Sequence, residues 1–227
     1  MVYAICLGIM VLMSKRKEFN RTWNSDLAYV IGIIATDGNL SPDGRHINVT
    51  SKDKEIVLAV QKILGLQNKI GMKGNGASSE KRYYVLQFGN MNMYDFLQDI
   101  GMHKNKSKTL GVLKVPDRVF RDFFRGCIDG DGSVATFSHP ESRHPQLRVR
   151  LCSASLNFLI WIKSQISKCL QIDRGWIYTT LDRSIHVLNF GKKDSIVLLN
   201  QIYHKNARFY LKRKYLIAKE FIDARVV

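Results

Sequence analysis

The chain has 227 residues, of which 45% are hydrophobic, and its 35 Lys and Arg against 19 Asp and Glu give a formal net charge of +16. This length and apolar content allow one large domain or two small ones, and they exclude an intrinsically disordered chain. The positive excess predicts a polyanionic partner, because each phosphate neutralised by Lys or Arg releases counterions. The four cysteines lack C-x-x-C spacing. They predict reduced thiols in an intracellular protein, with neither a zinc site nor a disulfide framework.

The chain opens with an apolar run, MVYAICLGIMVLM, at residues 1–13. A membrane-spanning helix needs roughly 20 apolar residues, and a secretory signal needs a basic start and a small-residue cleavage site. The run has neither property, so no membrane partner is expected. We assign residues 1–22 as an N-terminal extension without a known role.

Helix and strand patterns alternate from residue 24 onward. Asn24 or Ser25 can cap a first helix, which Gly38 ends. Ser-Pro-Asp-Gly at 41–44 predicts a turn between two short strands. Ser51 can cap the next helix, where apolar residues recur at helical spacing up to position 64. Strands near 68–73 and 82–88 and a short helix over 91–101 complete this first unit.

A basic segment at 106–117 is predicted to link the first unit to a second one, and Pro116 in it indicates a helix boundary. The second series runs from about 118 to 203 in the same order. A final amphipathic helix is predicted over 207–223, with Leu211, Tyr215, Leu216 and Phe221 on its apolar face. The predicted organisation is therefore an extension (1–22), a first repeat (23–105), a linker (106–117) and a second repeat with the last helix (118–227).

Matching segments in the same order indicate a diverged duplication. LAYVIGIIATDGNL at 27–40 and FFRGCIDGDGSV at 123–134 both contain Gly-x-x-x-x-Asp-Gly. VLQFG at 85–89 matches VLNFG at 187–191, and His-Lys-Asn at 103–105 recurs at 204–206. The offset between matching segments grows along the chain because the second copy has a longer loop at 138–146. The duplication makes Asp37 and Asp131 the same position in two copies.

Small residues near these aspartates would allow the two motif helices to pack side by side. Gly32 on the first motif helix, and Gly126 and Gly130 in the second motif, let two backbones approach closely. Two carboxylates at the adjoining ends of such helices repel each other, so one takes up a proton unless a cation lies between them. Mg²⁺ is the natural occupant, because it prefers oxygen ligands and binds phosphate oxygens.

The two motifs, VIGIIATDG at 30–38 and FRGCIDGDG at 124–132, resemble the motif of the LAGLIDADG homing endonucleases. The resemblance covers nearly everything after about residue 22. It implies an α+β fold that is a pseudo-two-fold tandem of two αββαββα repeats, each with a four-stranded antiparallel saddle for DNA. It also implies catalysis by Asp37 and Asp131, which would hold Mg²⁺ (or Mn²⁺ in its place) together with Thr36 and Gly130.

The resemblance further implies a basic residue near the scissile phosphate, at the start of the helix after the fourth strand. The matching position is Lys193 in the second copy and Met91 in the first. This difference predicts two halves of the active site that are not chemically equivalent. Asp129 matches Ala35 in the first copy, so its predicted role is structural.

Alternation along the strands predicts which side chains face DNA. In a strand of period two, one set of residues lies on the core and the other points outward, where Arg, Asn and Gln can pair with purine edges. The predicted DNA-binding residues are Arg45, His46, Asn48, Thr50, Lys69, Lys73, Arg82, Gln87, Arg148, Arg150, Arg174, Tyr178, Thr180, Arg183 and Asn189. Because the copies differ throughout these strands, the predicted target is asymmetric.

The function that the resemblance implies is a monomeric, site-specific endonuclease of double-stranded DNA. It would need no partner protein, and it would work in a prokaryotic cytoplasm or in an organelle matrix or stroma. An alternative on the same fold is an intron RNA maturase with reduced or no nuclease activity, for which host intron RNA would be the partner.

Overall fold

The computed structural model of the chain describes residues 18–74, 82–138, 140–142, 144–181 and 184–223. Most of the predicted N-terminal extension and one predicted DNA-binding residue, Arg183, lie outside the described residues. None of the described helices is long and apolar enough to cross a membrane.

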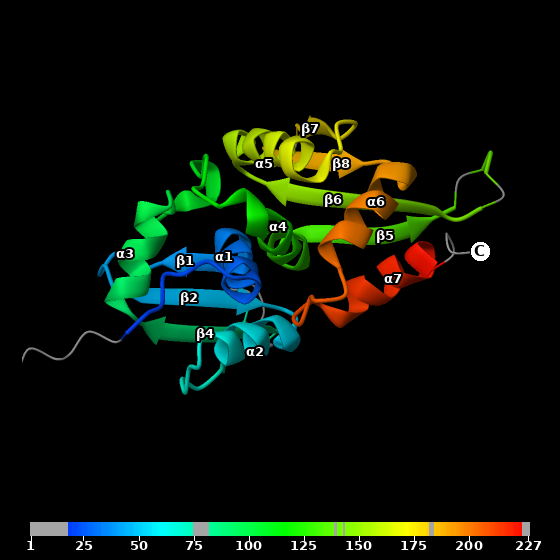
Figure 1. The fold of residues 1–227 in the computed structure, drawn as a ribbon. Helices are drawn as coiled ribbons and strands as arrows, with labels where there is room; N and C mark the ends of the chain where they lie inside the picture. The colour runs from blue at the N-terminus through cyan, green and yellow to red at the C-terminus, as the bar shows by residue number, and fades with distance from the viewer. Residues whose placement is uncertain (1–17, 75–81, 139, 143, 182–183, 224–227) are drawn as a thin grey trace, which may run out of the picture.

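One arrangement of helices and strands is used twice (Figure 1). The first unit comprises α1 (Ser25–Asp37), β1 (Gly38–Leu40), β2 (His46–Ser51), α2 (Lys54–Ile63), β3 (Gly71–Lys73), β4 (Tyr83–Gly89) and α3 (Met91–Asp99). The second comprises α4 (Phe120–Asp129), β5 (Gly132–Phe137), β6 (Gln146–Ser153), α5 (Leu156–Leu170), β7 (Trp176–Thr180), β8 (Ile185–Phe190) and α6 (Lys192–Ile202), and α7 (Lys212–Asp223) follows it. The predicted αββαββα order in both copies is confirmed.

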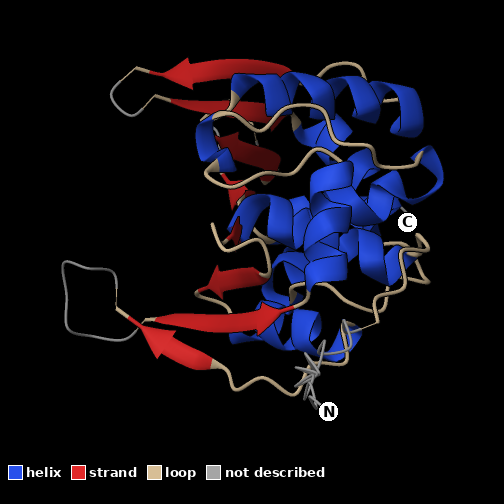
Figure 2. Cartoon of the chain, turned by 90° about the vertical axis from the view of Figure 1, so that its left-hand side faces the viewer, coloured by secondary structure: helices blue, strands red, loops and turns tan. Residues whose placement is uncertain are grey.

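Each unit pairs its four strands into one antiparallel sheet, in the orders β1-β2-β4-β3 and β5-β6-β8-β7. The segments VLQFG and VLNFG, which the sequence matches to each other, lie in the equivalent strands β4 and β8. Burial alternates along β2 and most of β6, as their period-two patterns predict. The strands of both sheets lie on one side of the molecule and the helices on the other (Figure 2), so each sheet keeps one face free of helices.

The two units share one hydrophobic core, which is centred on the packed helices α1 and α4. A buried polar network also joins them near the start of these helices. The carboxylate of Asp122 accepts hydrogen bonds from Ser25 Oγ at 2.6 Å, Arg125 Nη1 at 2.6 Å and His204 Nε2 at 2.9 Å. Since these groups come from both units, the network fixes how the two halves sit against each other.

Two predicted helix starts are wrong. α2 has Asp53 at its N-cap, whereas Ser51 accepts a hydrogen bond from the backbone N–H of Asp53 at 3.2 Å. The last helix begins at Lys212 instead of near 207, because the backbone before it is bound to α4 side chains. The carbonyl of Phe209 accepts a hydrogen bond from the Arg125 guanidinium at 2.9 Å, which holds the chain out of a helical path.

The apolar face predicted for the last helix also needs correction. Leu216, predicted to lie on that face, is 49% exposed. Leu211, the residue before the helix, is buried as predicted, and the buried residues within the helix are Lys214 and Ala218, which are four positions apart. Lys214 therefore lies on the buried face of the helix, where an apolar residue is expected.

Candidate active site at the ends of the paired helices

Close contact between α1 and α4 depends on two glycines. A Cβ atom on Gly32 would lie 2.1 Å from the carbonyl oxygen of Phe123, and one on Gly126 would lie 2.2 Å from that of Tyr29. Both distances are far below any van der Waals contact, so only glycine lets these backbones meet. The predicted close approach of the two motif helices is therefore confirmed at Gly32 and Gly126.

The helix ends bring the two motif aspartates together. Asp37 is the last residue of α1, whereas α4 ends at Asp129, so that Asp131 lies in the turn beyond it. A Cβ atom on Gly130 would lie 3.5 Å from Asp37 Oδ2, which places the Asp37 carboxylate against the turn that carries Asp131. The sequence predicts that the two aspartates lie close together. The structure adds that Asp37 is in a helix, whereas Asp131 is in a turn.

The two aspartates are in an environment that disfavours their charged forms. Burial, followed by the negative charge of Asp131, raises the pKa of Asp37 from 3.8 to about 7. Desolvation also raises the pKa of Asp131, although the residue is exposed at the surface. The Asp37 carboxyl therefore holds its proton to a higher pH than an ordinary aspartate, and a divalent cation would compete with that proton.

Two buried lysines lie beside the aspartates, and the sequence-based reasoning overlooked both. Lys106, in the turn after the first unit, is 5% exposed, and Lys214, in α7, is 2% exposed. Burial lowers the pKa of each to about 8, and the charges of Asp37 and Asp131 oppose this effect at Lys106. Both ammonium groups in turn hold down the pKa values of the two aspartates. The four groups therefore form one electrostatic unit.

Lys214 also holds the turn that carries Asp131. Its Nζ donates hydrogen bonds to the carbonyl oxygens of Gly132 at 2.6 Å, Ile128 at 2.7 Å and Asp129 at 2.9 Å, and more weakly to that of Gly130 at 3.4 Å. The carbonyls of Ile128 and Asp129 lie in the last turn of α4, where a helix offers no backbone partners of its own. A cation at a helix C-terminus also opposes the negative end of the helix dipole.

One signal could have identified Lys214, but none separates Lys106 from its neighbours. Lys214 interrupts an apolar stripe, and a lysine on the buried face of an amphipathic helix needs a partner. Lys106 stands in the basic segment HKNKSK, where no spacing distinguishes it from Lys104 or Lys108.

Asp129 has the structural setting that the sequence comparison predicts for it. Its buried carboxylate accepts hydrogen bonds from the hydroxyls of Tyr203 at 2.9 Å and Tyr29 at 3.1 Å, and from the backbone N–H of Leu211 at 2.8 Å. Since Tyr29 belongs to α1, Asp129 to α4 and Leu211 to the segment before α7, this carboxylate ties three parts of the chain together.

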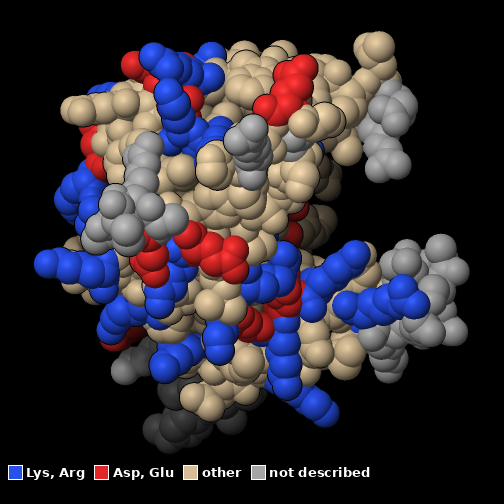
Figure 3. All heavy atoms as spheres, turned by 90° about the vertical axis from the view of Figure 1, so that its right-hand side faces the viewer, with Lys and Arg blue, Asp and Glu red and all other residues tan. Residues whose placement is uncertain are grey.

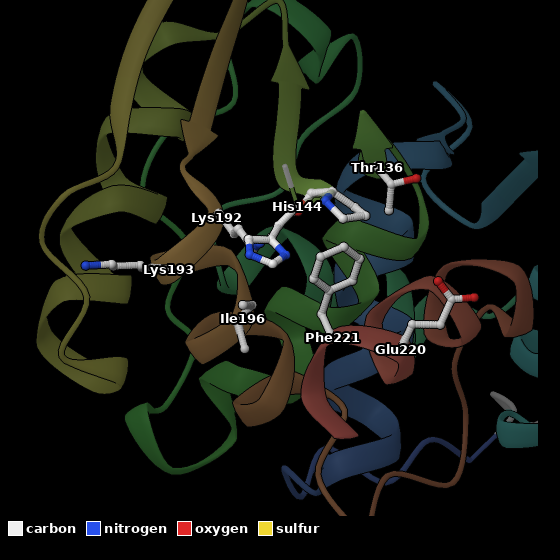
Figure 4. Close-up of a pocket in the computed structure, with 8 residues that line it drawn as sticks. Thr136, His144, Lys192, Lys193, Ile196, Glu220 and Phe221 are labelled. Carbon is white, nitrogen blue, oxygen red and sulfur yellow. The ribbon is translucent and has the colours of Figure 1, made fainter. Parts of the chain in front are cut away.

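The structure places Lys193 away from this electrostatic unit. It is an exposed residue in the first turn of α6, and it lies beside a cavity of about 740 Å³ that Thr136, His144, Lys192 and Phe221 also line. Its side chain points away from the rings of His144 and Phe221 (Figure 4). The charges that act most on Asp37 and Asp131 include Lys106 and Lys214 but not Lys193. A role for Lys193 at the scissile phosphate remains a prediction.

The predicted DNA-binding residues fall on the open strand faces or beside them. Side chains that are exposed at the surface are those of Arg45, Lys69, Lys73, Arg82, Gln87, Arg174 and Tyr178. His46, Asn48, Thr50, Arg148, Arg150 and Thr180 are partly buried, whereas Asn189 is fully buried. Figure 3 shows a surface hollowed between two projecting arms, with Lys and Arg gathered on the lower arm. The surface thus combines a recess with positive charge.

The donors that could hold a metal ion are few. No cluster of three or more His, Cys, Asp or Glu side chains occurs among the described residues. Asp37 and Asp131 supply carboxylate oxygens, and the backbones of Thr36 and Gly130 lie next to them in the chain. The Thr36 hydroxyl is engaged with its own helix, donating to the carbonyls of Gly32 and Ile33. An all-oxygen set of this kind suits Mg²⁺, which keeps several waters as ligands.

Comparison with known proteins identifies this fold. The family profile of the LAGLIDADG-like domain matches residues 24–101. A search of curated proteins by sequence finds no match. Variants of the homing endonuclease I-DmoI superpose with a TM-score of 0.57 at 15% identity, over 86% of this chain and 97% of theirs.

Two further solved structures have the same fold. The LAGLIDADG homing endonuclease I-LtrWI bound to its target DNA superposes with a TM-score of 0.60 at 13% identity, over 89% of this chain and 91% of that one. Full-length DUF199/WhiA from Thermatoga maritima superposes with a TM-score of 0.57 at 17% identity, over 94% of this chain but 64% of its own. The predicted fold class and the predicted resemblance are confirmed.

Proposed function

We propose that the protein is a site-specific endonuclease of double-stranded DNA. The match of residues 24–101 to the LAGLIDADG-like domain supports this proposal, as does the fold that the chain shares with LAGLIDADG homing endonucleases. The observation that carries the proposal is the meeting of Asp37 and Asp131 at the ends of two helices that touch through glycine. I-LtrWI and I-DmoI have both been solved with DNA, which supports a duplex as the partner.

In this proposal Asp37 and Asp131 hold Mg²⁺ (or Mn²⁺) together with the backbone of Thr36 and Gly130. I-DmoI has been solved with DNA and Mn and, as a variant, with its target DNA in the presence of Mg, which supports a divalent ion. When bound, the ion would activate water and stabilise the leaving oxygen of a phosphodiester. The raised pKa of Asp37 supports the assignment, because two like charges held this close need a cation to remain ionised.

The protein's own lysines would prepare this site. Lys214 fixes the turn that presents Asp131, because its ammonium group bonds the carbonyls on both sides of that residue. Lys106 offsets the charge of both aspartates and lies on the same end of the paired helices. We assign Lys106 and Lys214 a charge-balancing role beside the two aspartates, and Lys193 keeps its proposed role near the scissile phosphate.

The open strand faces would bind the duplex. The proposed contacts are those predicted from the strand pattern. Phosphates would contact the lower arm of Figure 3, where Lys and Arg gather, and bases would contact the sheets. Because both units lie in one chain, the proposed enzyme works as a monomer on an asymmetric site, inside a cell. The proposed division is a repeat at 23–105, a linker at 106–117 and a second repeat from 118.

A cleavage selection on a randomised duplex library with Mg²⁺ tests the proposal. The wild-type chain should yield one long, asymmetric site cut on both strands. Asp37→Asn and Asp131→Asn should each abolish cutting but keep duplex binding. Asp99→Asn, at an exposed ion pair with Arg21, is the matched control and should cut normally. Cutting by both single active-site variants would contradict the mechanism.

Further measurements distinguish the roles of Lys106 and Lys193, and they distinguish an endonuclease from a maturase. Lys106→Met should reduce cutting strongly, because it removes a positive charge that acts on both aspartates. Strong loss of cutting in Lys193→Met would support the predicted role of Lys193 at the scissile phosphate, and normal cutting would exclude that role. Tighter binding to structured intron RNA than to any selected duplex, without cutting, would favour the maturase.

A further inference from the structure

Arg150 and Asn189 form a side-chain pair on the open face of the second sheet. Arg150 Nε donates a hydrogen bond to Asn189 Oδ1 at 3.1 Å. Asn189 is 2% exposed, and its Nδ2 has no hydrogen-bond partner among the described residues. A buried amide with an unmet donor is costly, so its position requires an explanation.

The pairing of the strands shows where this pair lies. Arg150 in β6 stands opposite Ser133 in β5 and Asn189 in β8, and Asn189 stands opposite Trp176 in β7. These four residues form one cross-strand row. The row points to the side of the sheet that faces away from its helix-covered core, because its neighbours Val149 and Leu188 are fully buried.

The hydrogen bond through Nε fixes how the guanidinium group is presented. An arginine held at Nε has its plane oriented while its two terminal nitrogens remain available as a fork. That fork matches the O6 and N7 acceptors of guanine in the major groove, and a buttressed fork loses less side-chain entropy when it binds.

The equivalent row of the first sheet has different chemistry. Asn39 in β1, Asn48 in β2 and Gln87 in β4 stand opposite one another, at the register that matches Ser133, Arg150 and Asn189. Asn48 Nδ2 donates to Ser41 Oγ at 3.3 Å, and Gln87 is exposed. Side-chain amides pair with the N6 and N7 groups of adenine.

We propose that Arg150, oriented by Asn189, reads a guanine in the half-site under the second repeat, and that Asn48 and Gln87 read adenine at the matching distance in the other half-site. This inference rests on the proposed function and adds base identity to it. Arg150 is the reading residue, and Asn189 is a positioning residue that acts through it.

Arg148 offers a matched control on the same strand and the same face. Its guanidinium carbon lies 4.2 Å from the centre of the Phe137 ring, so its plane is occupied by an aromatic contact instead of a hydrogen-bonded partner. Loss of Arg148 removes one positive charge from the sheet, as loss of Arg150 does. A purely electrostatic role would therefore give the two variants the same phenotype.

The test is a selection of bound duplexes from a randomised library with Ca²⁺ in place of Mg²⁺. The wild-type chain should select guanine at one position of one half-site and adenine at the pseudo-symmetric position. Arg150→Gln should weaken the guanine preference at that position by roughly 5- to 150-fold, the worth of one bidentate base contact. Arg148→Gln should lower affinity and leave that preference unchanged.

Asn189 is tested with two variants, because its burial puts folding at risk. Asn189→Leu should broaden the preference at the guanine position, and Asn189→Asp should retain it, since a carboxylate also accepts from Nε. If the chain selects a duplex but shows no guanine preference that is lost in Arg150→Gln, this inference is wrong and the proposed function is unaffected. Failure to select any duplex overturns the inference together with the proposed function.

Discussion

Replacing Asp37 with Asn should stabilise the metal-free protein, and the gain should grow with pH. Asn keeps the size of the side chain but removes the charge that burial and Asp131 disfavour. The folded protein holds the Asp37 proton up to about pH 7, whereas the unfolded chain releases it near 3.8. The folded state is therefore penalised progressively as pH rises between these two values.

The magnitude follows from the shift in pKa. Raising the pKa of Asp37 from 3.8 to about 7 costs the wild-type fold at most about 4 kcal/mol once the pH is above 7. Below pH 4 both states hold the proton and the cost vanishes. The stability difference between Asp37→Asn and wild type should therefore rise from near zero at pH 4 to a few kcal/mol at pH 8.

Urea unfolding in EDTA, at several pH values from 4 to 8, measures this difference. The exposed variant Asp99→Asn should show no such slope. Adding Mg²⁺ at pH 8 should stabilise the wild type and leave Asp37→Asn nearly unchanged, because the ion then has one carboxylate fewer. A stability difference that stays constant across the pH range would refute the assigned electrostatics of the pair.

Further predictions concern the helix contact, the buried lysine and the bound duplex. Gly32→Ala should lose about 2 kcal/mol or more of unfolding free energy and all cutting, because its Cβ would lie 2.1 Å from the Phe123 carbonyl oxygen. The control Gly111→Ala places its Cβ where no atom lies within 4 Å, so its urea unfolding should match that of the wild type. Lys214→Met should cost roughly 3 kcal/mol and slow cutting, because it leaves carbonyls at the end of α4 without a donor; a variant with wild-type unfolding would contradict this. Duplex affinity, measured by fluorescence anisotropy, should fall linearly with salt on logarithmic axes; a Kd that does not change with salt would exclude phosphate contacts as its source.

The duplication explains why so much of the fold could be predicted from one sequence. VLQFG and VLNFG mark equivalent strands, and the two Asp-Gly motifs mark equivalent helix ends. Each match supports the other copy's assignment, whereas a single Asp-Gly would only have indicated a turn. Local rules failed at two helix starts. Ser51 accepts a hydrogen bond from the backbone N–H of Asp53 instead of capping α2, and a tertiary hydrogen bond from Arg125 to the Phe209 carbonyl keeps the chain before α7 out of a helix.

Sequence alone determined the order of elements, the pairing of Asp37 with Asp131 and the glycines that permit it, because these follow from periodicity and from repetition along the chain. The tertiary structure alone decided which basic residues lie beside the aspartates. Lys106 and Lys214 come from segments far apart in the chain, and only folding brings them to one site. Charge and composition are identical for a surface lysine and a buried one, so the difference lies in the surroundings that packing creates.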